Sequence, residues 1–284
     1  MKPAPFDYYA PKTISAAIDL LSQYGGDARL LAGGQTLMPM MNFRLAAPSV
    51  IIDLNRVEEL DFIECDGDVV RIGAMTRQRS IEFSPLVAEK LPLLSKAIQM
   101  VGHLPTRSRG TIGGSLANAD SAAELPMVLQ VLEGEVVVTG AKGRRTIKAC
   151  DLFVDSMVTT LEEDEILTEV RIPVMPPSAR FAVDEFSRRR GDFAIAAVAA
   201  VLTFEGPRCR TARLATAGVS PTPTRLSPAE RLLEGRIIDA AAIAEAGDEA
   251  AAAIEPMVDR NASEAYRRHL TKTLTMRVLK RAAH

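Results

Sequence analysis

The sequence contains no tryptophan, three cysteines and three histidines, and only 5% of its 284 residues are aromatic. Scarce aromatic side chains argue against a surface that stacks on nucleic-acid bases. Cys65, Cys150 and Cys209 lie far apart and form no CxxC pair. This spacing excludes the usual zinc and iron–sulfur motifs and argues against a disulfide framework. The histidines are equally scattered, so we expect no metal site in this chain.

The sequence also has little net charge, and its apolar runs are short. The 34 basic and 36 acidic side chains leave a net charge of −2, so no basic field is available for nucleic acid or an anionic membrane. The longest apolar stretch, residues 193–202, is about half of the roughly 20 residues that span a bilayer. Residues 1–5 lack the apolar run of a signal peptide. We therefore expect a cytoplasmic protein with no membrane span and no nucleic-acid partner.

The chain is long enough for about two domains of roughly 150 residues each. The best boundary is the segment 173–178, which reads Pro-Val-Met-Pro-Pro-Ser and cannot continue a helix or a central strand. We expect an α+β protein with one domain over residues 1–177 and a second over residues 178–284. Within the first, subdomains over about 1–57 and 58–177 are expected.

The first part of the chain begins with a helix that Thr13 caps and Gly25-Gly26 ends. Strands at 28–31 and 50–54, with a short helix around Pro39 between them, predict a small α/β unit. Further elements are expected as strands at 62–65, 69–72, 135–139, 146–148 and 165–172 and helices at 77–83, 91–100 and 122–132. Residues 102–121 show little periodicity, which predicts a long loop with a functional role.

Beyond the boundary the pattern predicts a small sheet followed by helices. Strands are expected at 181–186, 194–204 and 209–217, and helices at 240–254 and 262–281. Ser227-Pro228-Ala229-Glu230 is typical of a capping box at the start of another helix, with proline at its first position.

Two segments share a composition rich in glycine and hydroxyl residues. The first is Ala32-Gly33-Gly34-Gln35-Thr36-Leu37, and the second spans residues 110–120 and includes Thr111-Ile112-Gly113-Gly114-Ser115. Paired glycines let backbone N–H groups approach a ligand closely, which suits a pyrophosphate. Neither segment matches the Rossmann or P-loop pattern. The alternative is that both are ordinary turns, and physics alone leaves the two interpretations open.

These motifs, together with Asp120-Ser121-Ala122-Ala123-Glu124-Leu125-Pro126, resemble the FAD-binding subunit of molybdenum hydroxylases. That family includes the medium subunit of aerobic carbon monoxide dehydrogenase and the flavin domain of xanthine dehydrogenase. The resemblance covers the whole chain and includes residues 165–168, 188–194 and 266–270. It implies a two-subdomain FAD-binding region, like that of vanillyl-alcohol oxidase and PCMH, followed by a small antiparallel sheet-plus-helices domain.

The resemblance also implies which residues contact the cofactor. They are Ala32, Gly33, Gly34, Gln35, Thr36, Leu37, Thr111, Ile112, Gly113, Gly114, Ser115, Asn118, Glu124, Leu167, Asp192 and Phe193. Gln35-Thr36 stands where some relatives carry His-Ser, Glu124 where relatives often carry Asp, and Phe193 where carbon monoxide dehydrogenase-like relatives carry Tyr. Phenylalanine can pack on a ring but cannot donate a phenolic hydrogen bond.

What the resemblance implies for function is an electron-transfer subunit. FAD on this chain would accept electrons from the [2Fe-2S] clusters of a small partner subunit and pass them to a terminal acceptor. A large partner subunit would hold the molybdopterin, and the assembly would be a dimer of heterotrimers. Relatives with a cluster on this subunit carry an extra cysteine-bearing insertion, which this chain lacks.

No Ser-His-Asp, Cys-His or paired-carboxylate set can be assembled from the sequence, so we expect no catalytic side chain. Two other functions stay open, a stand-alone FAD oxidoreductase and a nucleotide-binding assembly module. Near the second glycine segment, Arg107 and Arg109 either balance phosphate charge or are solvated. Asp120 favours a structural Asx turn, and His103 has no partner carboxylate that the sequence identifies.

Overall fold

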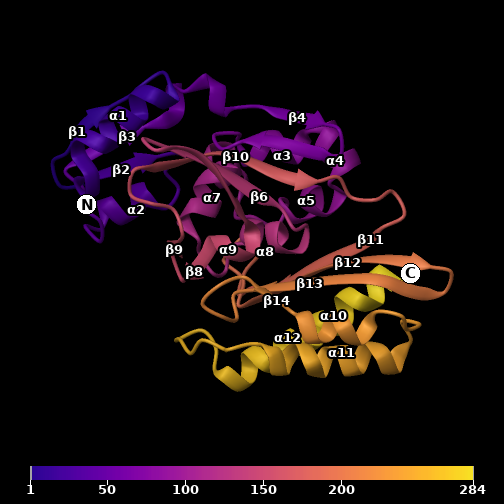
Figure 1. The fold of residues 1–284 in the computed structure, drawn as a ribbon. Coiled ribbons are helices and arrows are strands. Elements are labelled where there is room, and N and C mark those ends of the chain that lie inside the picture. Colours follow the sequence, from indigo (N-terminus) through magenta and orange to yellow (C-terminus); the bar gives the residue numbers. More distant parts are fainter. Residues whose placement is uncertain (1, 284) are drawn as a thin grey trace.

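The computed structural model describes residues 2–283. Its elements form an N-terminal part with two larger sheets and a two-stranded one, and a C-terminal part with one sheet and three helices (Figure 1). Short 3₁₀ turns lie at Gly25–Asp27, Leu54–Arg56 and Glu58–Leu60. The predicted mixture of helices and strands, with a small antiparallel sheet and helices at the C-terminal end, is confirmed.

The chain begins with a three-stranded parallel sheet in the order β1-β3-β2. Its strands are β1 (Asp7–Tyr9), β2 (Ala28–Leu31) and β3 (Val50–Asp53), and its helices are α1 (Ile14–Tyr24) and α2 (Leu37–Asn42). The Thr13 hydroxyl accepts a hydrogen bond of 3.2 Å from the Ala16 N–H, which confirms the predicted helix cap. The α/β unit is confirmed, with β1 added as a short strand that its three residues did not reveal.

The second sheet is antiparallel, with strands in the order β4-β5-β10-β6-β7. Its strands are β4 (Ile63–Asp66), β5 (Val69–Gly73), β6 (Glu135–Gly140), β7 (Gly143–Lys148) and β10 (Glu165–Pro173). The strands predicted in this part of the chain are therefore confirmed, and β4-β5 and β6-β7 pair as antiparallel hairpins. Around this sheet lie α3 (Gln78–Phe83), α4 (Pro85–Lys90), α5 (Pro92–Ala97), α9 (Ala149–Leu152) and the hairpin of β8 (Phe153–Asp155) and β9 (Val158–Thr159).

The long loop predicted over residues 102–121 is wrong, because this stretch forms two short helices. They are α6 (Leu104–Arg109) and α7 (Ile112–Asn118). Thr111 caps α7 by accepting a 3.0 Å hydrogen bond from the Gly114 N–H, and Ile112 and Leu116 point from the same side of the helix into the core. Each helix has fewer than two turns, so apolar periodicity could not develop.

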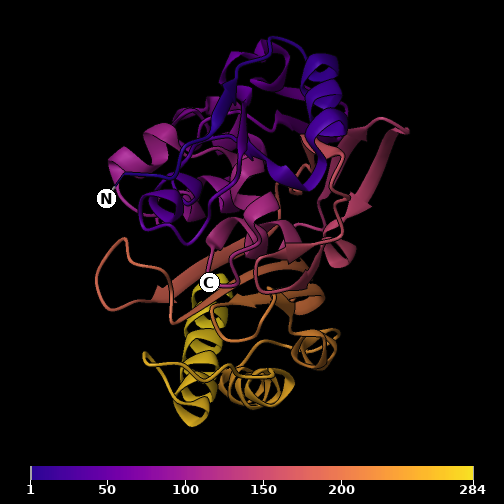
Figure 2. The ribbon, with the colours of Figure 1, turned by 90° about the vertical axis from the view of Figure 1, so that its left-hand side faces the viewer.

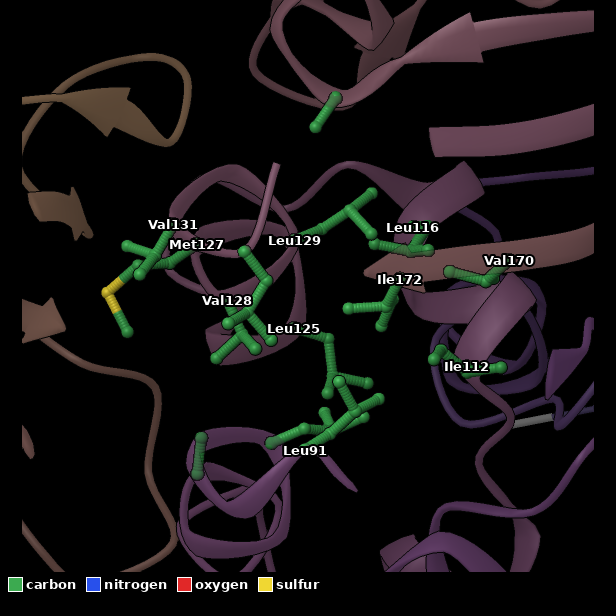
Figure 3. Packing of buried hydrophobic residues seen from close by; sticks show 14 of the residues in the cluster. Leu91, Ile112, Leu116, Leu125, Met127, Val128, Leu129, Val131, Val170 and Ile172 are labelled. Atoms are coloured by element: carbon green, nitrogen blue, oxygen red, sulfur yellow. The ribbon is translucent and has the colours of Figure 1, made fainter. Parts of the chain in front are cut away.

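Helix α8 (Glu124–Val131) is buried over its entire length. Figure 3 shows Leu125, Val128 and Leu129 within the cluster that also contains Leu91 and Leu116. A helix that is apolar on all sides belongs inside a protein. Its burial holds the first residue of α8 in a defined place.

The C-terminal sheet is covered on both faces. Its order is β11-β12-β13-β14, with β11 (Arg180–Phe186), β12 (Ala196–Glu205), β13 (Arg208–Ala217) and β14 (Thr224–Arg225). Along β12, Ala197 and Ala199 join the core of the N-terminal part, whereas Ala196 and Val198 join the core beneath the C-terminal helices. Figures 1 and 2 show this sheet as a layer between the N-terminal part and the C-terminal helices. Alternation along a strand explains both contacts.

The C-terminal helices are α10 (Ser227–Leu233), α11 (Ala240–Ala253) and α12 (Glu264–Ala283). Helix α10 starts where the sequence predicted, but the capping box does not form. The Glu230 carboxylate instead accepts hydrogen bonds of 2.7 Å from both the Leu214 N–H and Arg225 Nε. The Glu230 side chain therefore forms an ion pair with Arg225 and does not cap the helix.

Glu169 in β10 is the centre of a buried ionic cluster. Its carboxylate accepts hydrogen bonds from Arg71 Nε at 2.7 Å, Arg171 Nε at 2.8 Å and Arg144 Nη2 at 2.5 Å. Burial disfavours the charge of Glu169, but the hydrogen bonds from Arg71 and Arg171 outweigh it and lower its pKa to about 2.

We expect Glu169→Gln to lower the free energy of unfolding by about 3 kcal/mol at pH 7, because three arginines lose their common partner. A lowered pKa stabilises the fold above the unfolded value of 4.5, and this contribution disappears as pH falls from 4.5 towards 2. Urea unfolding at several pH values measures it. Glu64→Gln is the control: Glu64 pairs with Arg71 at 3.6 Å but is 59% exposed, so a loss below about 1 kcal/mol is expected.

Candidate functional site

A cavity of about 790 Å³ lies between the parallel sheet, α7 and residues 191–193 of the C-terminal part. This volume is within the range of roughly 300–1,000 Å³ that cofactor and small-molecule sites occupy. The structure brings both glycine segments together here. All the residues that the sequence singled out as cofactor contacts line the cavity, except Ile112, whose side chain is buried in the hydrophobic core.

Gly33 is the point where the two glycine segments touch. A Cβ atom at this position would lie 2.5 Å from the Arg109 carbonyl oxygen and 2.7 Å from Gly110 Cα. Both distances are too short for non-bonded atoms, so only glycine allows this approach. The Gly110 carbonyl in turn accepts a 2.9 Å hydrogen bond from the Gln78 N–H, which ties the second segment to α3.

The first segment offers free hydrogen-bond donors. Within residues 2–283, the backbone N–H groups of Gly34, Gln35 and Thr36 donate to no protein acceptor. Gln35 turns its side chain back, and its Nε2 donates to the Gly33 carbonyl at 3.2 Å. Unpaired N–H groups grouped in a turn suit an anion such as a phosphate.

The second segment has already used most of its donors. The Gly113 N–H donates to the Ala74 carbonyl at 2.9 Å, and the Gly114 N–H donates to Thr111 Oγ1 at 3.0 Å. A Cβ atom at Gly113 would lie 2.5 Å from that of Ala74. In this segment, therefore, the glycines chiefly provide close packing and leave an open wall for a ligand.

Cationic side chains contribute little to this site. Arg107 Nε pairs with Glu82 at 2.9 Å, its Nη1 donates to the Val101 carbonyl, and neither Arg107 nor Arg109 lines the cavity. Arg29 is the one cationic side chain in the lining formed by the described residues, and it donates to the Gly26 carbonyl at 2.9 Å. The phosphate-balancing role considered for the two arginines is not supported.

The wall near α8 is acidic and buried. Glu124 is 3% exposed and lines the cavity. Burial raises the pKa of this carboxyl to about 8, and the negative charges of Glu185 and Asp120 add to the rise. Asp120 itself closes an Asx turn by accepting a 2.9 Å hydrogen bond from the Ala122 N–H, which confirms its structural role.

The remaining wall combines β10 with the C-terminal part. Leu167 presents a buried apolar side chain, and Phe193 is 60% exposed beside Asp192. The loop that carries Phe193 crosses towards α6, where Gly191 packs directly against the His103 ring. His103 therefore contacts this loop, and no carboxylate among the described residues pairs with it.

Sequence reasoning missed Gln78, which is 4% exposed and lines the cavity. Its Oε1 atom is buried without a hydrogen-bond partner among the described residues. A Cβ atom at Gly110 would lie 2.7 Å from this oxygen, so the Gln78 side chain packs against the second glycine segment. The signal was absent from the sequence because Gln78 is one polar residue in a short helix outside both glycine segments.

The site therefore fits a large phosphate-bearing cofactor: it offers unpaired N–H groups, an apolar wall and an exposed aromatic ring. Two family models match consecutive parts of the chain. The FAD binding domain in molybdopterin dehydrogenase matches residues 4–175, and the CO dehydrogenase flavoprotein C-terminal domain matches residues 181–282. The chain therefore belongs to the FAD-binding family of molybdopterin dehydrogenases. The resemblance read from the sequence is confirmed, as is FAD as the cofactor.

Individual relatives match over nearly the whole chain. The chain is 38% identical to the 6-hydroxypseudooxynicotine dehydrogenase complex subunit alpha of Paenarthrobacter nicotinovorans, covering 100% of this chain and 96% of that protein. A solved carbon monoxide dehydrogenase from Hydrogenophaga pseudoflava is 38% identical with a TM-score of 0.97, covering 99% and 98%. A solved quinoline 2-oxidoreductase from Pseudomonas putida 86 is 37% identical with a TM-score of 0.95, covering 100% and 98%. This chain is an oxidoreductase subunit.

Residues 2–283 contain neither a metal-binding cluster nor a membrane-spanning helix. No cluster of three or more His, Cys, Asp and Glu side chains is arranged to hold a metal ion in this range. None of the helices described there combines the length and the apolar character needed to cross a membrane.

Gly33→Ala is expected to weaken FAD binding about 5- to 150-fold, because the added methyl group would separate the two glycine segments. Overpacking of this kind costs about 1–3 kcal/mol, and 1.4 kcal/mol corresponds to a factor of ten. Flavin fluorescence quenching on titration with FAD measures the affinity. Gly26→Ala is the matched control, because its Cβ atom would find only Glu163 Oε2, at 3.8 Å. Equal affinities for the two variants would contradict the role given to Gly33.

Proposed function

We propose that this chain is the FAD-carrying electron-transfer subunit of a heteromeric molybdenum hydroxylase. It would accept electrons from [2Fe-2S] clusters on a small partner subunit and pass them to a terminal acceptor. A large partner subunit would hold the molybdopterin, in a dimer of heterotrimers. The observation that carries the proposal is the single cavity to which both glycine segments and the 191–193 loop contribute.

Bound FAD would supply the redox chemistry, and the protein's task is to bind and orient it. We assign the FAD pyrophosphate to the free N–H groups of Gly34, Gln35 and Thr36 and the wall formed by residues 111–115. Leu167, Asp192 and Phe193 are assigned to the flavin ring, with Asn118 and Glu124 as polar contacts. In Figure 1 the C-terminal sheet lies against α8, the helix that begins with Glu124.

The substrate is proposed to bind on a partner subunit. The similar proteins are named for compounds as different as carbon monoxide, quinoline and 6-hydroxypseudooxynicotine. An architecture shared among proteins with such different substrates is expected of a chain that transfers electrons and does not bind the substrate. The cavity lining also contains no histidine among the described residues, and histidine is the side chain that most often acts as general base.

The finer structural and cellular expectations belong to the same proposal. We infer a vanillyl-alcohol-oxidase/PCMH-like FAD-binding domain over residues 1–177, with subdomains over about 1–57 and 58–177, and a C-terminal flavoprotein domain over residues 178–284. We also infer a cytoplasmic location, which the free thiols of Cys65, Cys150 and Cys209 support, since thiols persist in reducing compartments.

Reconstitution tests the proposal directly. The purified full chain, incubated with FAD and desalted, is expected to retain the visible absorption of an oxidised flavin. The loaded chain alone should not oxidise small organic substrates. It should turn over an artificial acceptor only when the two partner subunits are added. A chain that stays colourless contradicts the proposal, and turnover by the chain alone favours a stand-alone oxidoreductase.

Phe193→Ala is expected to weaken FAD binding about 2- to 12-fold, since an aromatic contact contributes about 0.5–1.5 kcal/mol beyond area burial. Phe193→Tyr retains the ring and should bind FAD within about twofold of the unmodified chain. Phe83→Ala is the control, because Phe83 is similarly exposed (62% against 60%) but packs under Arg79 outside the cavity. An unchanged affinity in Phe193→Ala would remove this residue from the proposed site.

A further inference from the structure

Two side chains outside the cavity connect the glycine segments behind the point where these segments touch. Asn55 follows β3, in the part of the chain that carries the first segment, whereas Arg77 comes directly before α3, in the part that carries the second. Neither residue lines the cavity. Any effect of this pair on a ligand must therefore pass through the segments themselves.

Arg77 holds the second glycine segment. Its backbone pairs with Thr111 in an isolated antiparallel bridge, and its Nη1 donates to the Arg109 carbonyl oxygen. That oxygen is the atom against which Gly33 packs, since a Cβ atom on Gly33 would lie 2.5 Å from it. Arg77 therefore fixes the peptide that forms one side of the contact between the two segments.

Asn55 holds the first glycine segment. Its Nδ2 donates to the Ala32 carbonyl at 3.0 Å and also to Asp53 Oδ1, and its Oδ1 accepts a hydrogen bond from Arg77 Nη2. These contacts use both amide hydrogens and the amide oxygen, so a carboxylate could not replace this side chain. Although Asn55 is exposed, its backbone N–H donates to Asp53 at 2.9 Å, and Asp53 is only 9% exposed. The amide is thus anchored to the end of β3.

The first segment depends on this one tie. Within residues 2–283, the bond from Asn55 is the only hydrogen bond that a side chain outside residues 32–37 donates to this segment. The free N–H groups of residues 34–36 follow directly after the tied carbonyl. A shift of that peptide would move these donors relative to the wall at residues 111–115. Donors that are fixed before a ligand arrives cost less to order on binding.

We propose that Asn55 and Arg77 are positioning residues that set the spacing between the two glycine segments, so that the N–H groups of residues 34–36 face the wall at residues 111–115 across the FAD pyrophosphate. The proposal rests on the proposed function for the identity of the ligand. Arg77 acts through the direction of its two N–H donors and not through its charge, because the guanidinium group is a rigid, planar fork.

The test is the FAD dissociation constant of the full chain, measured by flavin fluorescence, beside the free energy of unfolding of each ligand-free variant in urea. Arg77→Met should weaken FAD binding about tenfold, which is the lower end of what a hydrogen bond from a charged group contributes. Asn55→Ala should weaken it by a similar factor. The double variant should bind FAD within about threefold of Arg77→Met, whereas independent effects would multiply to about a hundredfold.

Two further variants separate positioning from charge and from loss of stability. Arg77→Lys keeps the positive charge but has one nitrogen in place of the fork, so FAD binding should stay weakened. Arg79→Met is the matched control in the neighbouring helix. Arg79 pairs with Glu82 at 3.1 Å and lies over the Phe83 ring, and none of these three residues lines the cavity. This variant should bind FAD like the unmodified chain.

Three results would overturn the proposal. The first is an unchanged FAD affinity in folded Arg77→Met, whatever its loss of stability, because the pair would then be merely structural. The second is full affinity in Arg77→Lys, because charge alone would then suffice. The third is multiplication of the separate effects of Arg77→Met and Asn55→Ala in the double variant, because the two residues would then not act together.

Failure of the unmodified chain to bind FAD contradicts the proposed function instead, and hydrogen exchange in the ligand-free chain then decides on the pair. The N–H groups of Gly110 and Ile112 donate to protein carbonyl groups, so their exchange reports how firmly the second segment is held. Their exchange should be several-fold faster in Arg77→Met than in Arg79→Met. Equal rates in the two variants would show that Arg77 does not hold the segment.

Discussion

Contact between the backbone at Gly33 and the Arg109–Gly110 peptide is the constraint on which the cavity depends. It brings the turn after β2 against the segment that connects α6 to α7, with no space for a side chain between them. The polar groups of that connection are paired as well, since Gln78 N–H donates to the Gly110 carbonyl and Arg77 donates to that of Arg109. A satisfied, closely packed backbone leaves little freedom to move. The cavity wall is thus rigid where a pyrophosphate would lie.

Cationic side chains are scarce around the cavity. Phosphate-binding sites often use arginine or lysine, but here Arg107 pairs with Glu82. Among the described residues of the cavity lining, the charged side chains are acidic apart from Arg29. Recognition of an anionic cofactor consequently depends on the free N–H groups of the first segment. A neutral Glu124 is consistent with this scheme, because an additional negative charge in the same cavity would oppose binding.

The C-terminal sheet links the site to helices that do not touch it. One face of the sheet packs on the core around α8, and the other packs on α10, α11 and α12. Arg267 of α12 is 3% exposed and donates to the carbonyl groups of Ile195, at 2.7 Å, and Gly218. Ile195 follows closely on Phe193, so α12 helps to fix the loop that closes the cavity. Contacts from the far side of the sheet therefore help to place the Phe193 loop.

Local patterns in the sequence determined most of the elements, and the reason is physical. Strand alternation, the Thr13 cap and the prolines after residue 172 act through neighbouring residues, so their effects are visible in order along the chain. The glycine segments likewise predicted where a cofactor site would form. The two short helices within residues 102–121 were not predicted, because neither is long enough to show a helical period of apolar residues.

Only the tertiary structure decided which partners meet. Glu230 pairs with Arg225 and the Leu214 N–H in place of a local helix cap, since a buried ion pair competes successfully with a cap. Gln78 reaches the cavity from α3, and nothing in its sequence neighbours marks it. The sequence by itself determined the two glycine segments, and its resemblance to a family implied the flavin. Folding decided which N–H donors stay free and which carboxyl groups are buried, because both depend on residues distant in the chain.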